Sequence, residues 1–243
     1  MVTEPQLHRP GSDGHDDHRG VLVWRFDTPR AALSSAAVGG GRIDASWVVN
    51  LGVHSDYARV DLEAHATELT ARFGLVGPGI TLFTAADVTR RRRCRIGGVT
   101  VDATVGVTRP TWAADPTWTE GTPWTEGTAW REAAARRAPG PAGPAPSRPG
   151  TINLVVQVPV VLDEGAAVNA VITATEAKTQ ALIEHDVPGT GTASDAVVVL
   201  WPRADAVPAD SEVARFAGPR SPVGAALALA VHGAVRAGLE PAR

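Results

Sequence analysis

The run Ala196–Trp201, with the sequence AVVVLW, is the feature that most limits what this chain can fold into. Its residues are all apolar, so it lacks the alternation of apolar and polar positions that a strand with one solvent-exposed face shows. A run of this kind is typical of a strand buried on both faces, inside a sheet that other elements cover. The sequence therefore predicts a layered protein built around a covered β-sheet.

Other segments supply the rest of the predicted sheet and its helices. The expected strands are Val21–Phe26, Ser46–Val53, Ile80–Thr84, Gly98–Val107 and Ile152–Val158. Ala31–Val38 is expected to be an extended segment that follows the first strand. The expected helices are Tyr57–Phe73, Glu164–His185 and Pro222–Ala237. These elements predict a mixed β-sheet packed by two to three helices, an α+β or α/β layered fold. We expect a single domain over residues 19–243.

Two segments have the composition of disordered chain. Residues 1–18 are polar and rich in Gly, Asp and His, and we expect a disordered tail there rather than a metal site at its His and Asp residues. Residues 108–149 are rich in Thr, Pro, Gly and Ala and hold four regularly spaced tryptophans: Trp112, Trp118, Trp124 and Trp130. We interpret this stretch as an insertion, at least partly disordered. Its tryptophans could alternatively clamp a planar ligand or a partner.

Composition excludes several classes of protein. A net charge of −3, with 44% hydrophobic and 20% charged residues, is unlike a disordered polyampholyte, a membrane bundle or a basic nucleic-acid binder. The one cysteine, Cys94, cannot form an intrachain disulfide. The longest apolar stretch, residues 225–231, is far shorter than the roughly 20 residues that span a bilayer. We therefore expect a cytoplasmic protein with neither nucleic-acid nor membrane partners, and read the basic run Arg90–Arg93 as a solvated turn.

Lys178 is unusual because it is the only lysine beside 22 arginines. On a helical wheel of residues 164–185 it lies within the apolar arc, which also holds Ile172 and Ile183, while Gln180 and Glu184 lie opposite. A lysine on the buried side of a helix needs an anionic partner or carries a lowered pKa, and either state suits catalysis or anion binding. The alternative is a lysine whose stem packs while its ammonium reaches the solvent.

Two glycine-rich segments are further candidates for a site. The loop Gly189–Asp195 offers close backbone approach, hydroxyls and one carboxylate before a buried strand, although a plain turn would look the same. The triplet Gly39–Gly41 follows Ser34 and Ser35 and could expose backbone N–H groups to an oxyanion, or could form a simple hairpin turn. The scattered histidines have no metal-ligand spacing, so we expect no metal held by the protein.

Taken together, these pieces resemble the adenosylcobinamide amidohydrolase family of cobamide salvage. The resemblance lies in Arg30–Gly41, Asn50 with Tyr57, Gly150–Asn153, Thr173–Leu182 and Gly189–Asp195. These pieces are spread over residues 20–237, so they cover nearly all of the expected domain. The rare residues Lys178, Asn50, Asn153 and Tyr57 all fall within them.

The resemblance implies hydrolysis of the amide that joins the aminopropanol arm to the corrin ring of adenosylcobinamide, which yields adenosylcobyric acid and aminopropanol. It implies that the substrate is a corrinoid, which carries its own cobalt. It also implies that the protein itself holds no cofactor. For such chemistry we assign water activation to Asp195 or Glu176, and oxyanion stabilisation or amine protonation to Lys178. The expected substrate-binding residues are Ser34, Ser35, Gly39, Gly40, Gly41, Asn50, Thr151, Asn153, Thr175, Thr190 and Thr192.

Two alternatives stay open from the sequence. In one, Thr151 or Ser34 is a covalent nucleophile of an amidase, with Lys178 as its base. In the other, the chain is a corrinoid-binding module that has kept the fold and lost the chemistry. The oligomeric state, the exact corrinoid and the order of residues 108–149 do not follow from the sequence.

Overall fold

The computed structural model describes residues 2–11, 18–54, 57–114 and 150–241. Three residues of the tail, His15, Asp16 and Asp17, lie outside these ranges, where no metal site is expected. Most of the insertion, with Trp118, Trp124 and Trp130, also lies outside the described residues. The strands are β1 (Gln6–His8), β2 (Val21–Ser34), β3 (Gly41–Gly52), β4 (Gly79–Thr84), β5 (Arg92–Ile96), β6 (Val99–Gly106), β7 (Thr151–Gln157), β8 (Val161–Leu162), β9 (Ala196–Trp201) and β10 (Val213–Ala214). The helices are α1 (Leu62–Arg72), α3 (Glu164–Ile183) and α4 (Pro222–Leu239).

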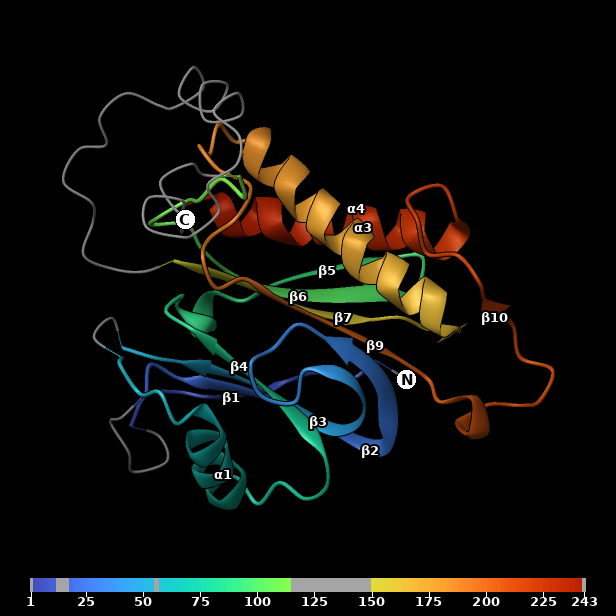
Figure 1. Ribbon diagram of the computed structural model, residues 1–243, viewed down its shortest axis with the longest axis horizontal. Coiled ribbons are helices and arrows are strands. Elements are labelled where there is room, and N and C mark those ends of the chain that lie inside the picture. Colours follow the sequence, from blue (N-terminus) through green and yellow to red (C-terminus); the bar gives the residue numbers. More distant parts are fainter. Residues whose placement is uncertain (1, 12–17, 55–56, 115–149, 242–243) are drawn as a thin grey trace, which may run out of the picture.

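The main sheet is mixed and has the strand order β4-β3-β2-β9-β7-β6-β5, with β1 paired to β2. It folds over, so that β2, β3 and β4 form one layer and β9, β7, β6 and β5 form another (Figure 1). The long strand β2 joins the two layers, and its register with β3 shifts between Arg25 and Arg30. Helix α1 covers the first layer, while α3 and α4 cover the second. The α+β layered fold predicted from the sequence is confirmed.

Alternation along the strands explains why the sheet is buried on both faces. In β9, Val197, Val199 and Trp201 pack under α3 and α4, whereas Val198 and Leu200 point into the space between the layers. Strand β7 alternates in the same way, since successive side chains of a strand point to opposite faces. The prediction drawn from Ala196–Trp201 is therefore confirmed, because every residue of that strand is buried.

Capping residues fix where the two long helices begin. Asp163 accepts a hydrogen bond from the backbone N–H of Ala166, and Ser221 accepts one from Gly224. Pro222 occupies the first turn of α4, where its fixed φ and missing N–H do no harm. Among the described residues, only α4 has the length and hydropathy of a membrane-spanning helix. Its Leu227, Val231 and Val235 pack in the core against the sheet, as in a core helix.

Several predicted boundaries were wrong. The segments 21–26 and 31–38 form one strand, β2, and residues 6–8 of the expected tail pair with it as β1. Helix α1 begins at Leu62 rather than Tyr57, and Val60, which lies within the expected helix, is 94% exposed. On α3, Ile172 and Ile183 were assigned to the buried arc but are exposed. The buried face of α3 is narrower than the expected apolar arc and is made mostly of alanine.

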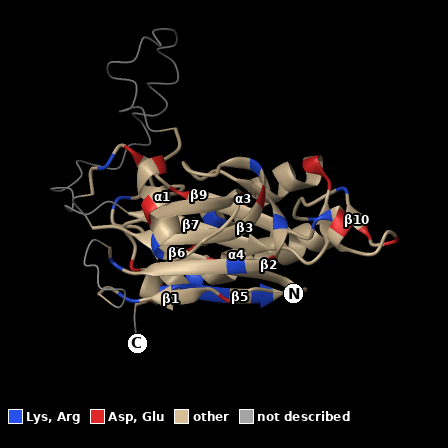
Figure 2. Cartoon of the chain, turned by 90° about the horizontal axis from the view of Figure 1, so that it is seen from below, with Lys and Arg blue, Asp and Glu red and all other residues tan. Residues whose placement is uncertain are grey.

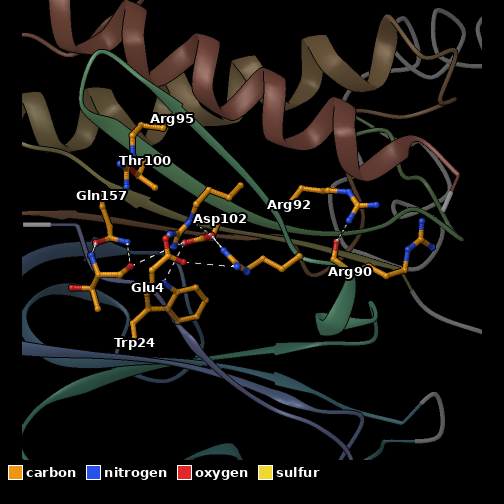
Figure 3. A network of polar contacts seen from close by, with 11 residues as sticks. Glu4, Trp24, Arg90, Arg92, Arg95, Thr100, Asp102 and Gln157 are labelled. Atoms are coloured by element: carbon orange, nitrogen blue, oxygen red, sulfur yellow. Dashed lines mark hydrogen bonds and ion pairs between the residues drawn. The ribbon is translucent and has the colours of Figure 1, made fainter. Parts of the chain in front are cut away.

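The basic run is not a solvated turn. Arg92, Arg93 and Arg95 belong to β5, which shows as a row of basic residues at one edge (Figure 2). Arg91 and Arg93 bind Asp102 of β6, whose side chain is 1% exposed and faces the space between the layers. Arg93 donates to both carboxylate oxygens of Asp102, at 2.8 and 2.6 Å (Figure 3). The arginines are therefore needed to bury a carboxylate.

The Asp102 cluster also joins the two layers and the N-terminal segment. Trp24 of β2 donates its indole N–H to Asp102 at 3.3 Å, and Arg93 also pairs with Glu4 (Figure 3). The buried Gln157 accepts from the backbone N–H of Thr3 at 2.8 Å and donates to the Thr3 carbonyl at 2.9 Å. These contacts hold the N-terminal segment against the same edge.

We expect the Asp102→Asn variant to lower the free energy of unfolding by about 3 kcal/mol, because it leaves the charges of Arg91 and Arg93 without their buried partner. Denaturant unfolding measures this loss. Asp205→Asn, which breaks an ion pair on the surface, is the matched control and should leave stability nearly unchanged. Equal stability of the Asp102→Asn variant and the parent would contradict the role given to the cluster.

Candidate functional site

A cleft of about 560 Å³ opens between the two layers, at the edge where the parallel strands β7 and β9 begin. The layer under α3 and α4 contributes Thr151, the first residue of β7, and residues 193–196 before and at the start of β9. The opposite layer contributes His54, Tyr57 and residues 81–85 at the end of β4. Residues 35–37, after β2, complete the lining near β9.

Asp195 is the most heavily bonded side chain of the cleft. Its Oδ1 accepts from the backbone N–H of Ile152 at 2.9 Å and from the hydroxyl of Thr192 at 2.5 Å. Its Oδ2 accepts from the Nζ of Lys178 at 2.5 Å and from the backbone N–H of Thr192 at 3.1 Å. A carboxylate has about four lone-pair sites, so these four donors occupy its accepting capacity.

Lys178 approaches Asp195 from α3, with its side chain 8% exposed. Its burial confirms the expectation that the lone lysine points inward to an anionic partner. Lys178 is not among the residues that line the cleft, so it lies behind Asp195. Gly191 crosses this pair so closely that an added Cβ would collide with Asp195 Oδ2 and Lys178 Nζ, which explains a glycine at this position.

Two hydroxyls meet beside this ion pair. The Thr151 hydroxyl lies 3.0 Å from that of Ser194, and either can donate. Thr151 is 3% exposed at the base of the cleft, while Ser194 is exposed in the loop before β9. Because Asp195 also binds the N–H of Ile152, the loop is joined to the first two residues of strand β7.

The opposite wall is aromatic. The Tyr57 ring stacks on His65 and Phe83 with centroid separations of 5.6 and 6.0 Å, and its hydroxyl lies 2.8 Å from His65 Nδ1. Burial raises the pKa of Tyr57, while the nearby charge of Arg59 lowers it. The phenol therefore stays protonated at neutral pH.

Arg59, at the mouth of the cleft, is held by two carboxylates. It donates to Asp61 at 2.8 Å and to Glu68 at 2.6 Å. The hydrogen bond from Arg59 is the largest cause that lowers the pKa of Asp61, to about 2. The guanidinium group is thus paired with two exposed carboxylates.

Asn50 and Asn153 bridge the layers beneath the cleft. Asn50 donates to the Thr104 hydroxyl at 3.0 Å and accepts from Asn153 at 3.0 Å. Asn153 also donates to the carbonyl of Phe83 at 3.1 Å. Both asparagines are 1% exposed and hold β3, β6 and β7 together under the site.

The structure brings some expected site residues together and separates others. Ser35, Thr151 and Asp195 line the cleft, with Lys178 and Thr192 bonded to Asp195. Ser34 is buried beside Ser35, and its hydroxyl accepts from the N–H of Ala36. The remaining expected residues are not part of the cleft lining.

Glu176 and Thr175 are exposed on the outer face of α3, away from the cleft lining. Two helix positions separate Glu176 from Lys178, which places their side chains on opposite sides of the helix. The triplet Gly39–Gly41 forms the turn between β2 and β3, where a Cβ at Gly39 would meet the backbone of Gly79. Thr190 bonds to Thr111. The geometry therefore gives none of these residues direct access to the cleft.

Reasoning from the sequence missed Ser194, His54, Phe83 and Arg59. Ser194 stands beside Asp195 in a loop already singled out, so its hydroxyl was a usable signal. The others come from distant elements, and only the folding of the sheet places them opposite Thr151. Among the described residues, no cluster of three or more His, Cys, Asp or Glu side chains is placed to hold a metal.

The chain matches a known protein family over nearly its whole length. Residues 6–243 match the model of the adenosylcobinamide amidohydrolase family. An adenosylcobinamide amidohydrolase of Halobacterium salinarum is 33% identical over 225 residues, which cover 92% of this chain and 85% of that protein. The chain belongs to this family. It is accordingly an amidohydrolase, an enzyme that hydrolyses an amide bond, and the resemblance seen in its sequence is confirmed.

Solved structures are similar at a lower level. The PH0078 protein of Pyrococcus horikoshii aligns over 98% of this chain and 83% of its own, with a TM-score of 0.42 and 12% identity. A beta-aminopeptidase of a Burkholderia species aligns over 90% of this chain and 78% of its own, with a TM-score of 0.38 and 17% identity.

The Lys178–Asp195 pair gives a stability prediction. We expect Lys178→Met and Asp195→Asn each to lower the free energy of unfolding by about 3 kcal/mol, because each leaves a buried group unpaired. The double variant should lose less than the sum by about 1–3 kcal/mol. Additive losses in denaturant unfolding would show that the two side chains do not interact.

Tyr57 gives a pH prediction, because it is the only tyrosine and its ionisation can be followed by ultraviolet absorbance. The titration midpoint in the folded enzyme should exceed that in denaturant, near the ordinary value of 10.0. Since the raised pKa favours the neutral phenol in the folded state, this contribution to stability is complete below pH 10 and is lost as the pH rises through the folded pKa.

Arg59→Gln should raise the Tyr57 midpoint further, since it removes the positive charge that lowers it. Identical midpoints in the folded and denatured enzyme would contradict the burial of the phenol.

Proposed function

We propose that this amidohydrolase cleaves the amide between the aminopropanol arm and the corrin ring of adenosylcobinamide. The products would be adenosylcobyric acid and aminopropanol, formed in the cytoplasm during corrinoid salvage. Membership of the family and the name of the Halobacterium relative support this substrate. The cobalt belongs to the substrate, and the reaction as proposed draws on the side chains of the chain itself.

One observation carries the proposal: a hydroxyl pair and a buried ion pair meet at one wall of the cleft. Thr151 and Ser194 present hydroxyls, while Lys178 and Asp195 fix the loop that carries Ser194. Amide hydrolysis needs a nucleophile and a proton donor for the leaving amine, held in place before the substrate binds. The facing wall of Tyr57 and Phe83 provides apolar surface for the substrate beside the reacting amide.

The geometry favours a positioning role for Asp195. Water activation requires a free lone pair on the carboxylate, and four donors already occupy both oxygens. Lys178 touches the cleft only through Asp195, so its role is to hold that carboxylate. The pair thereby keeps the 191–195 loop and the start of β7 in register.

Purified enzyme incubated with adenosylcobinamide should release aminopropanol and adenosylcobyric acid, detected by mass spectrometry. Asp195→Ala should lower kcat by about 100-fold with a smaller change in KM, because misplacement of reacting groups affects the chemical step more than binding. Glu63→Gln, an exposed change on α1, is the control. Binding of adenosylcobinamide without any product would instead support a corrinoid-binding module.

A further inference from the structure

We infer that the Thr151 hydroxyl is the nucleophile of this enzyme and that Ser194 carries its proton to the leaving amine. The inference rests on the proposed function for its substrate. It departs from direct attack by water, because it requires a covalent acyl-enzyme on Thr151. Three features of the cleft lead to it: the position of Thr151, its hydroxyl partner and the occupied lone pairs of Asp195.

The position of Thr151 follows from the alternation of β7. Ile152, Leu154 and Val156 pack under α3 and α4, so Thr151, Asn153 and Val155 face the space between the layers. Thr151 is the first of these and therefore lies where that space opens into the cleft. A side chain on a buried strand is held more rigidly than one on a loop, as a nucleophile requires.

Ser194 is placed to receive the proton of Thr151. Their oxygens are 3.0 Å apart, a hydrogen-bond distance, and Thr151 can be the donor. Ser194 is exposed to the cleft and adjoins Asp195, whose bonds to Lys178 and Thr192 fix the loop. The ion pair thus sets the position of the proton carrier.

The other candidate groups are less suited to attack. The Asp195 lone pairs are occupied, and Glu176 lies on the outer face of α3. Ser34 does not line the cleft. The Ser35 hydroxyl accepts from the N–H of Val197 at 3.0 Å, at the side of the cleft formed by the turn after β2.

The proposed step balances without an added co-reactant. The Thr151 oxygen bonds to the amide carbon while its proton passes to Ser194, and the Ser194 proton passes to the amide nitrogen. The carbon–nitrogen bond breaks and aminopropanol leaves, with the corrin carboxyl held as an ester on Thr151. Water then attacks the ester, the carboxylic acid is released and the proton returns through Ser194 to Thr151.

Variants of the two hydroxyls test the step with adenosylcobinamide as substrate. Thr151→Val should lower turnover at least about 1000-fold, as for loss of a nucleophile. Ser194→Ala should lower it by about 100-fold, as for loss of proton transfer. Thr151→Ser, which keeps a hydroxyl, should retain measurable turnover and guards against a folding defect. Thr173→Val changes a buried threonine of α3 outside the cleft and is the matched control.

A β-lactone probe tests the nucleophile without the natural substrate. Peptide mapping should locate the adduct on Thr151 in the parent enzyme and find none in Thr151→Val. Labelling of Thr151 without release of aminopropanol would keep the nucleophile and reject the substrate. Release by folded Thr151→Val at a rate within tenfold of the parent, or labelling of Ser194 instead of Thr151, would overturn the inference and leave the proposed function standing.

Discussion

Burying a polar side chain between the two sheet layers costs free energy unless that side chain is hydrogen-bonded or ion-paired. Strands that are buried on both faces place every second residue there, and most of these residues are apolar. The polar exceptions include Asp102, Asn50 and Asn153, and each has a partner on another strand, although the Asn153 Oδ1 atom has none among the described residues. These bonds hold the two layers together. A different alignment of the strands would leave the buried polar groups unpaired and would cost free energy, so the bonds favour this one alignment.

The need to pair a carboxylate is met at both Asp102 and Asp195, which lie in different surroundings. Asp102 is surrounded by Arg91, Arg93 and Trp24, which leaves its carboxylate 1% exposed and closes one edge of the sandwich. Asp195 is likewise saturated by donors, but it lies at the edge where β7 and β9 begin and the layers part. One carboxylate is therefore closed off inside the fold, while the other lies at the proposed site.

Much of the fold could be predicted because it depends on local patterns. The apolar run at Ala196–Trp201 and the helix around Lys178 were sufficient to predict a covered mixed sheet and an inward-pointing lysine. The arginine run could not be interpreted in the same way, since its partner Asp102 is recognisable only when β5 and β6 pair. The extent of β2 was missed because the chain bends through a register shift without ending the strand.

The candidate site was predicted in part, for a similar reason. Lys178 and Asp195 could be singled out from the sequence, as the only lysine and as the carboxylate of a glycine-rich loop, whereas Thr151 came from the family resemblance. Glu176 was included as a carboxylate near Lys178 in sequence, although the separation of two helix positions turns its side chain to the outer surface. The aromatic wall was found only in part: the family resemblance included Tyr57, but Phe83 was missed because it faces Thr151 only after the sheet folds over.

The burial of the only lysine has a practical side. Reagents that attach to primary amines, such as succinimidyl esters, find no accessible ε-amino group on this chain, since the surface cations are guanidinium groups that these reagents leave untouched. Attachment of this chain to a resin or a dye through a lysine therefore requires a lysine introduced at the surface. The position chosen for that residue would set the orientation of the attached molecules.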